Sequence, residues 1–194
     1  MKSIITNMLL LCLSILLVGS MAQVSHYGPC RIIEPMKNFE INNFMGTWYG
    51  IKGYPIIYET HEKCNSVNFT RIDNNEVLIE RSSIDLISGA VIRSGAVATL
   101  TNNPAVAKLS SPFLKFIKPH TELITLDTDY KNFAIQHMCQ SIGVISLMYI
   151  WILSRDRKLD HQSEEYVNNY LYQQVIPTLP LWNVDQDDCP DTLE

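Results

Sequence analysis

Short runs of apolar and β-branched residues recur along the chain at even spacing, and polar turns separate them. The clearest pair covers 64–72 and 77–81, with the polar turn Asp73-Asn74-Asn75-Glu76 between them. One further strand-like run opens at Gly46, and five others cover 89–100, 108–117, 122–127, 132–140 and 145–154. Eight short strands joined by tight turns are typical of a closed barrel. We therefore predict an all-β fold, an eight-stranded antiparallel up-and-down β-barrel.

The residues after the last strand-like run change to a helical period. Val167, Leu171 and Val175 recur at four-residue spacing. Ser163 is the expected N-cap and Pro177 the expected end. The run before them is apolar on both faces, with Met148, Ile150 and Ile152 on one and Leu147, Tyr149, Trp151 and Leu153 on the other. Because both faces must be covered, we predict one C-terminal α-helix outside the barrel and a second face that lines the interior.

The first 22 residues have the layout of a secretory signal peptide. Lys2 precedes the apolar run 8–18, which is too short for an ordinary membrane span, and Ser20 and Ala22 fit a cleavage site. Cleavage after Ala22 would leave one domain, 23–194, with 14 basic and 20 acidic residues and a net charge of −6. That charge argues against nucleic acid or an anionic membrane as the partner. We expect a secreted, extracellular protein without a membrane span.

An even number of cysteines would remain in the mature chain, namely Cys30, Cys64, Cys139 and Cys189. In an exported chain they are expected to form two disulfides, with three possible pairings. The triplet Asn68-Phe69-Thr70 is a glycosylation sequon, and a glycan on Asn68 would have to point into solvent. Period-two alternation then places Cys64 on the same outward face and turns Val67 and Phe69 inward.

Three short motifs resemble those of the lipocalins in their order and spacing. They are Gly46-Thr47-Trp48-Tyr49 at the start of the first strand, Thr128-Asp129-Tyr130 in a turn, and Arg155 at the end of the last strand. In lipocalins the tryptophan sits at the closed end of the barrel and the arginine lies across its ring. The resemblance therefore implies a cation–π contact between Trp48 and Arg155, with Asp129 in a loop at the same end.

The chain resembles in particular the group formed by apolipoprotein D and the insect lipocalins, which includes bilin-binding proteins. This resemblance implies disulfides between Cys30 and Cys139 and between Cys64 and Cys189. Two departures stand out, because Arg31 follows the first cysteine where a proline is common and Gly50 follows Trp-Tyr where a glutamate is common. Neither touches the barrel-closing contacts, but both weaken the transfer of a particular ligand.

No residue pattern indicates catalysis or a metal site. The histidines, His26, His61, His120, His137 and His161, are scattered and lack metal-ligand spacing. His137 lies in mid-strand and could ligate haem, but it shares a face with Cys139, which the implied disulfide places outside. The chain also lacks a nucleophile elbow and a glycine-rich phosphate loop. We expect a protein that is not an enzyme and has no cofactor. Bilin is one of the possible ligands.

The function that fits an eight-stranded barrel is enclosure of a small lipophilic molecule, such as a lipid, bilin, retinoid, steroid or pheromone. Phe69 and Trp151 are candidates for the cavity wall because of their strand parity. Phe113 and Tyr149 are added by the resemblance. The segment 55–63, with Tyr58 and His61, corresponds to the family's long loop over the barrel mouth and is expected to gate the entrance.

Two other classes of function compete with the carrier. One is a secreted interaction protein or inhibitor whose barrel is filled by its own side chains and whose loops act outward, for example on a cell-surface receptor. The other is a haem or redox protein that uses His137. For any of the three we expect a monomer or a weak homo-oligomer.

Overall fold

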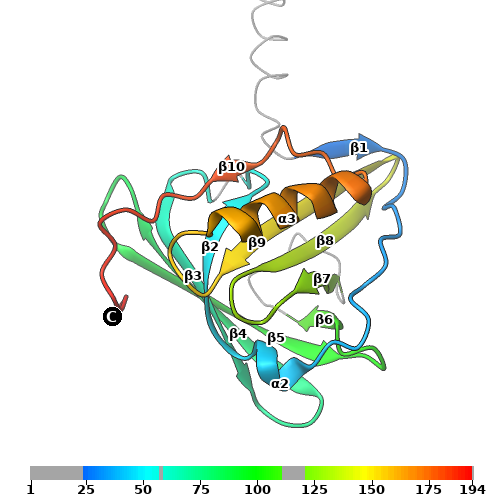
Figure 1. Ribbon diagram of the computed structural model, residues 1–194, viewed down its shortest axis with the longest axis horizontal. Coiled ribbons are helices and arrows are strands. Elements are labelled where there is room, and N and C mark those ends of the chain that lie inside the picture. The colour runs from blue at the N-terminus through cyan, green and yellow to red at the C-terminus, as the bar shows by residue number, and fades with distance from the viewer. Residues whose placement is uncertain (1–23, 57–58, 111–120, 194) are drawn as a thin grey trace, which may run out of the picture.

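The computed structural model describes residues 24–56, 59–110 and 121–193. Its barrel strands are β2 (Gly46–Gly53), β3 (Glu62–Arg71), β4 (Glu76–Asp85), β5 (Val91–Leu100), β6 (Val106–Ser110), β7 (Glu122–Thr128), β8 (Ala134–Ile142) and β9 (Ile145–Ser154). Each strand pairs antiparallel with the next, and β9 pairs with β2, which closes the barrel. The predicted eight-stranded up-and-down barrel is confirmed (Figure 1).

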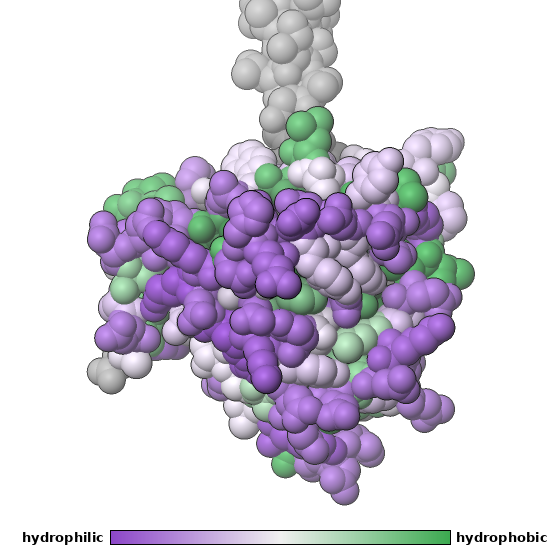
Figure 2. All heavy atoms as spheres, viewed as in Figure 1, coloured by the Kyte–Doolittle hydropathy of each residue, from purple (hydrophilic) through white to green (hydrophobic). Residues whose placement is uncertain are grey.

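In the described part of the chain, two short strands and two helices complete the fold. β1 (Ser25–Tyr27) pairs with β9, and β10 (Trp182–Asn183) pairs with β2. α2 (Ile41–Phe44) precedes the first barrel strand, and α3 (His161–Gln173) follows the last one. In Figure 1, α3 lies across the outside of the barrel in front of β8 and β9. Hydrophilic residues predominate on this face of the molecule (Figure 2), as expected for the solvent side of an amphipathic helix.

Several expected boundaries move. The run predicted from residue 89 begins at Val91, because Gly89 takes a positive φ of 70° in a tight turn whose amides donate to the Asp85 carboxylate. The strand predicted for 77–81 extends to Asp85. β6 ends at Ser110, and the remainder of that predicted strand lies outside the described residues, as does the predicted signal peptide 1–22.

The predicted helix is present, but its two ends were wrong. Its N-cap is Asp160, whose carboxylate accepts hydrogen bonds from the backbone N–H and the hydroxyl of Ser163. The hydroxyl of Ser163 is therefore a donor to the cap. The helix ends at Gln173, well before Pro177, and Val175 reverses the chain with a φ of 55°. Val175 is exposed as a result, and Ile176 packs into the core in its place.

The apolar core lies on both sides of the barrel wall, as the two-faced last strand predicted. On the outer side, Ile150 and Ile152 of β9 pack with Val167 and Leu171 of α3. On the inner side, Tyr149 packs with Ile56, Met138 and Leu147 near the barrel mouth. α3 therefore covers the outer face of β9 and leaves the inner face to the interior. Within the described part of the chain, no helix has the length and apolar character needed to span a membrane.

Candidate ligand-binding cavity

The closed end of the barrel is built around Trp48, which is completely buried. Its indole N–H donates to the backbone oxygen of Phe44 at 2.9 Å, and the two rings stack with centroids 5.0 Å apart. Phe69 meets Phe44 edge-on at 5.0 Å. The Arg155 guanidinium carbon lies 3.8 Å from the centroid of the Trp48 ring, a cation–π contact that contributes about 1–2 kcal/mol when shielded from water.

The charge of Arg155 is satisfied by backbone carbonyl groups. Its Nη1 donates to the oxygen of Thr47 at 2.7 Å, and its Nη2 donates to that of Met45 at 2.8 Å. The same side chain therefore fixes the segment that leads into β2. Gly46 lies in this segment with a φ of 90°, a conformation that L residues rarely adopt.

The Asp129 turn lies beside this end and is held by its own side chain. Its carboxylate accepts from the backbone N–H groups of Asn132 at 2.7 Å and Lys131 at 3.0 Å. Burial tends to raise the pKa of Asp129, but these hydrogen bonds outweigh it and hold the pKa below its usual value. The hydroxyl of Tyr130 accepts from the backbone of Glu40, and the Arg155 Nε donates to the oxygen of Tyr130. The turn thus ties the N-terminal segment to the closed end.

Two disulfides attach the tails to the barrel wall, and they join the pairs implied by the lipocalin resemblance. Cys30 bonds Cys139 of β8, and Cys64 of β3 bonds Cys189. Cys64 lies in a register shift of β3 and has a φ of 59°, so its N–H leaves the ladder and donates to Asp185 of the tail at 2.8 Å.

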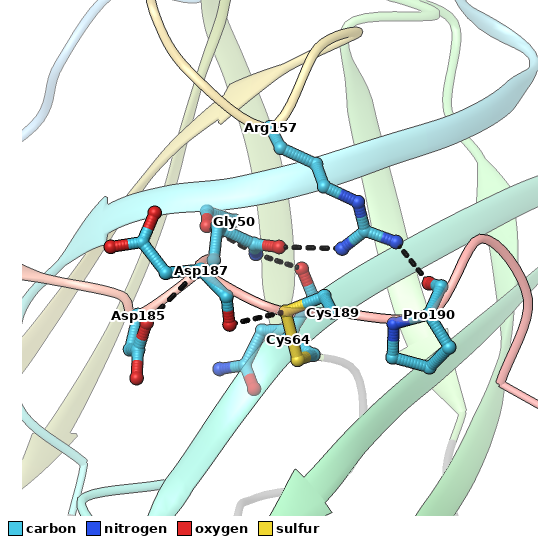
Figure 3. Close-up of a disulfide and its surroundings, with 9 residues drawn as sticks. Gly50, Cys64, Arg157, Asp185, Asp187, Cys189 and Pro190 are labelled. Atoms are coloured by element: carbon cyan, nitrogen blue, oxygen red, sulfur yellow. Dashed lines mark hydrogen bonds between the residues drawn. A yellow bond between two sulfur atoms is a disulfide. The ribbon is translucent and has the colours of Figure 1, made fainter.

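Arg157 and Gln186 hold the same tail, and Figure 3 shows Arg157 beside Cys189 and Pro190. The Gln186 amide donates to the backbone oxygens of Gly50 and Asn65 at 2.9 and 2.8 Å, and it accepts from Arg157 at 2.9 Å. Arg157 also donates to the oxygen of Pro190. No sequence pattern indicates this role of Gln186, because a single glutamine in a polar tail has no distinctive spacing.

A cavity of about 600 Å³ occupies the barrel above the closed end. This volume is within the range of small-molecule sites, roughly 300–1,000 Å³. Its apolar lining comes from most of the barrel strands and includes Val67, Phe69, Ile79, Ile92, Leu109, Leu123, Met138, Trp151 and Leu153. Strand parity holds for most of β3, since Asn65, Val67 and Phe69 line the cavity and Cys64 and Asn68 lie at a hollow on the outer wall, whereas Ser66 borders both.

The predicted cavity residues take different places. Phe69 and Trp151 line the cavity, whereas Tyr149 is buried beside it with its ring stacked on Trp151, centroids 5.9 Å apart. Phe113 and Tyr58 lie outside the described residues. His61 is exposed on the turn before β3, and its side chain is not part of the described lining.

A polar cluster interrupts the apolar lining near the mouth. The Arg81 guanidinium donates to the carboxylate of Glu62, and its Nε lies 3.4 Å from Glu59 Oε1. Ser83 also donates to Glu62, at 2.7 Å. The pKa of Glu59 is raised, mainly by burial and to a lesser extent by the negative charge of Glu62. The positive charge of Arg81 and a hydrogen bond with Trp151 lower this pKa but do not cancel the rise.

Sequence reasoning missed this cluster, although a signal for it exists. Arg81 stands opposite Val67 in the β3–β4 ladder, just as Ile79 stands opposite Phe69. An arginine in register with inward residues predicts a charge inside the barrel, and such a charge needs an anionic partner.

His137 lies on the other side of the wall from the cavity. It shares strand parity with Ile135, which packs under α3, whereas Gln136 and Met138 line the cavity. The imidazole is 2% exposed, and neither ring nitrogen has a hydrogen-bond partner among the described residues. Burial and then the charge of Arg31 lower the pKa of His137 to about 4, so the ring is neutral at pH 7. It cannot reach a haem held inside the barrel.

The geometry defines the class of small closed β-barrels that enclose a cavity sealed at one end. The sequence model of the lipocalin-like domain matches residues 39–186, and the chain belongs to the lipocalin family. Apolipoprotein D of Cavia porcellus is 31% identical over 192 residues, which cover 96% of this chain and 100% of that protein. The bilin-binding protein of Pieris brassicae is 25% identical over 159 residues, covering 80% of this chain and 82% of that one.

Solved structures agree with this fold. Insecticyanin from the tobacco hornworm Manduca sexta superposes with a TM-score of 0.67 at 21% identity, and the match covers 86% of this chain and 90% of that one. The resemblance predicted from the tryptophan, turn and arginine motifs is therefore confirmed.

Proposed function

We propose that the protein is a secreted carrier that holds one small lipophilic molecule inside the barrel. The observation that carries this proposal is the apolar cavity of about 600 Å³ between the Trp48 seal and the mouth. Burial of about 300 Å² of apolar ligand surface would contribute about 7 kcal/mol before the entropic cost of binding is subtracted. The similarity to the bilin-binding protein of Pieris brassicae supports the same kind of ligand.

Export and the absence of catalysis belong to the same proposal. The signal-like segment 1–22 and two disulfides support an oxidising, extracellular location. Phe69 and Trp151 contact the ligand in this proposal, and Tyr54, Ile56 and Glu59 form part of the entrance.

Asn68 is proposed as a glycosylation site. It lies at the outer hollow, and its amide nitrogen donates to the Thr70 hydroxyl of the same sequon at 3.0 Å. A glycan attached there would extend away from the cavity. Enzymatic deglycosylation of the secreted protein should reduce its mass by one glycan, and Asn68→Gln should remove that difference. An unchanged mass after deglycosylation would contradict the proposal.

The carrier function is tested by extraction and by fluorescence. Organic extraction of the protein from its native fluid should yield one dominant lipophile at near equimolar amount. Titration of stripped protein with that compound should change the emission of Trp151, which lines the cavity. Trp151→Phe should abolish most of the change, since Trp48 is sealed at the closed end and is not part of the cavity lining. No extractable compound and no saturable response to added lipophiles would contradict the carrier function.

A further inference from the structure

The charges around the cavity do not balance. Among the described residues that line it, the charged ones are Lys52, Glu59, Glu62 and Arg81. The Lys52 ammonium lies 2.5 Å from Glu164 of α3, so its charge is used on the outside of the barrel. Two carboxylates and one guanidinium therefore remain at the inner wall.

The Arg81 guanidinium pairs mainly with the Glu62 carboxylate. That side chain is only 4% exposed, and it accepts from both Arg81 and Ser83. Glu59 has the weaker share, because only the Arg81 Nε approaches it, at 3.4 Å. The Glu59 side chain is 16% exposed at the cavity wall. Among the described residues that line the cavity, no cation pairs with Glu59 alone. A carboxylate placed this way favours a positive group that arrives with the ligand.

A second acceptor of the cavity lining is also unfilled. The amide oxygen of Asn65 is buried and has no hydrogen-bond partner among the described residues. A buried acceptor without a donor costs about 1–3 kcal/mol, and this oxygen has almost no accessible surface, so a ligand N–H can reach it only after the Asn65 side chain rotates. Asn65 lies on the cavity side of β3, next to Gly50 of β2.

We propose that the cavity selects an amphipathic ligand with an apolar body and a protonated nitrogen, which binds at Glu59 near the mouth, and that it disfavours ligands ending in a carboxylate. This inference rests on the proposed carrier function and specifies its ligand class. The apolar lining holds the body of the ligand. The undercompensated carboxylate of Glu59 pairs with the nitrogen, whereas a fatty-acid anion would meet two carboxylates that share one guanidinium.

Three probes with the same alkyl chain test the proposal on the mature, disulfide-bonded protein. They are dodecylamine, dodecanol and dodecanoate, each titrated at neutral pH below its aggregation concentration with Trp151 emission as the readout. The wild type should bind the amine about 10-fold more tightly than the alcohol, since a hydrogen bond to a charged group is worth this much. Dodecanoate should bind most weakly. Equal or tighter binding of dodecanoate than of the amine would overturn the proposal.

Variants locate the preference. Glu59→Gln should reduce amine affinity about 10-fold while changing dodecanol affinity little. The matched control is Glu80→Gln, which removes the same charge from an exposed position on β4 and should keep the amine preference. If Glu59→Gln keeps that preference, the nitrogen does not bind at Glu59 and the proposal fails. If Glu59→Gln does not fold, the order of the three probes on the wild type still decides.

The outcome also separates this inference from the carrier function. Saturable binding of dodecanol without any preference for the amine would leave the carrier intact and overturn the ligand class. Failure of all three probes to bind the wild type would contradict both.

Discussion

The two ends of the barrel hold a partly buried arginine in opposite ways. At the closed end, Arg155 donates to backbone carbonyls and lies on the Trp48 ring, so its charge is held by groups that the fold itself fixes. Near the mouth, Arg81 meets two carboxylates and leaves one of them undercompensated. The first arrangement is complete without a ligand and stabilises the barrel. The second becomes balanced only when a positive group enters, which is the property of a binding site.

Changes at the closed end should therefore cost stability without altering ligand selectivity. Trp48→Ala should lower the free energy of unfolding by about 4 kcal/mol, because it leaves a large cavity against Phe44 and removes the ring under Arg155. Urea denaturation measures this loss, and Trp182→Ala on the exposed strand β10 should change it by less than about 0.5 kcal/mol. A loss below about 1 kcal/mol for Trp48→Ala would contradict the importance of the seal.

The outer wall between the two ends should give the protein a pH-dependent stability. His137 has a folded pKa of about 4, lowered by burial and by Arg31, whereas an unfolded histidine titrates near 6.5. Between these values the unfolded chain binds more protons than the folded one, so stability falls as the pH drops through this window. Full protonation of the unfolded state corresponds to a loss of about 3 kcal/mol.

The measurement compares unfolding at pH 7 and pH 4 for the wild type and His137→Leu. The leucine variant should lose about 3 kcal/mol less than the wild type over this interval. The exposed His61→Leu is the control and should keep the pH dependence of the wild type. Identical pH profiles for His137→Leu and the wild type would show that His137 is solvated in the native state.

A smaller effect is expected at the glycine that leads into β2. Gly46 has a φ of 90°, so Gly46→Ala should lower the unfolding free energy by about 1 kcal/mol through backbone strain. An added methyl group would lie 3.5 Å from Arg155 Nη1, which is ordinary contact, so no clash adds to this cost. Gly95 of β5 lacks a positive φ, and Gly95→Ala should be neutral or slightly stabilising. Thermal melting of the two variants makes the comparison, and equal losses would exclude the strain at Gly46.

The same contrast explains what could be predicted from the sequence. The closed end has motifs, because one tryptophan, one arginine and one turn must occupy fixed places for the barrel to close. Helix ends were missed because Asp160 and Ser163 both fit an N-cap and only the packed chain selects between them. The polar cluster was missed because Glu59 lies in a connecting turn, where strand parity does not predict the orientation of a side chain. Its ion-pair partner, Arg81, lies on a separate strand, β4.

The comparison is sharpest for the two glutamates that share Arg81. Glu59→Gln should change the free energy of unfolding by less than about 1 kcal/mol, since relief from burial and from Glu62 offsets the lost attraction to Arg81. Glu62→Gln should cost about 3 kcal/mol, because it removes the buried carboxylate that Arg81 and Ser83 both use. Urea denaturation of the ligand-free variants measures both. If Glu59→Gln costs as much as Glu62→Gln, Glu59 is a structural partner like the carbonyls around Arg155, and the mouth does not differ from the closed end. A small cost together with the lost amine preference would mean that the carboxylate near the mouth contributes to ligand binding and little to folding.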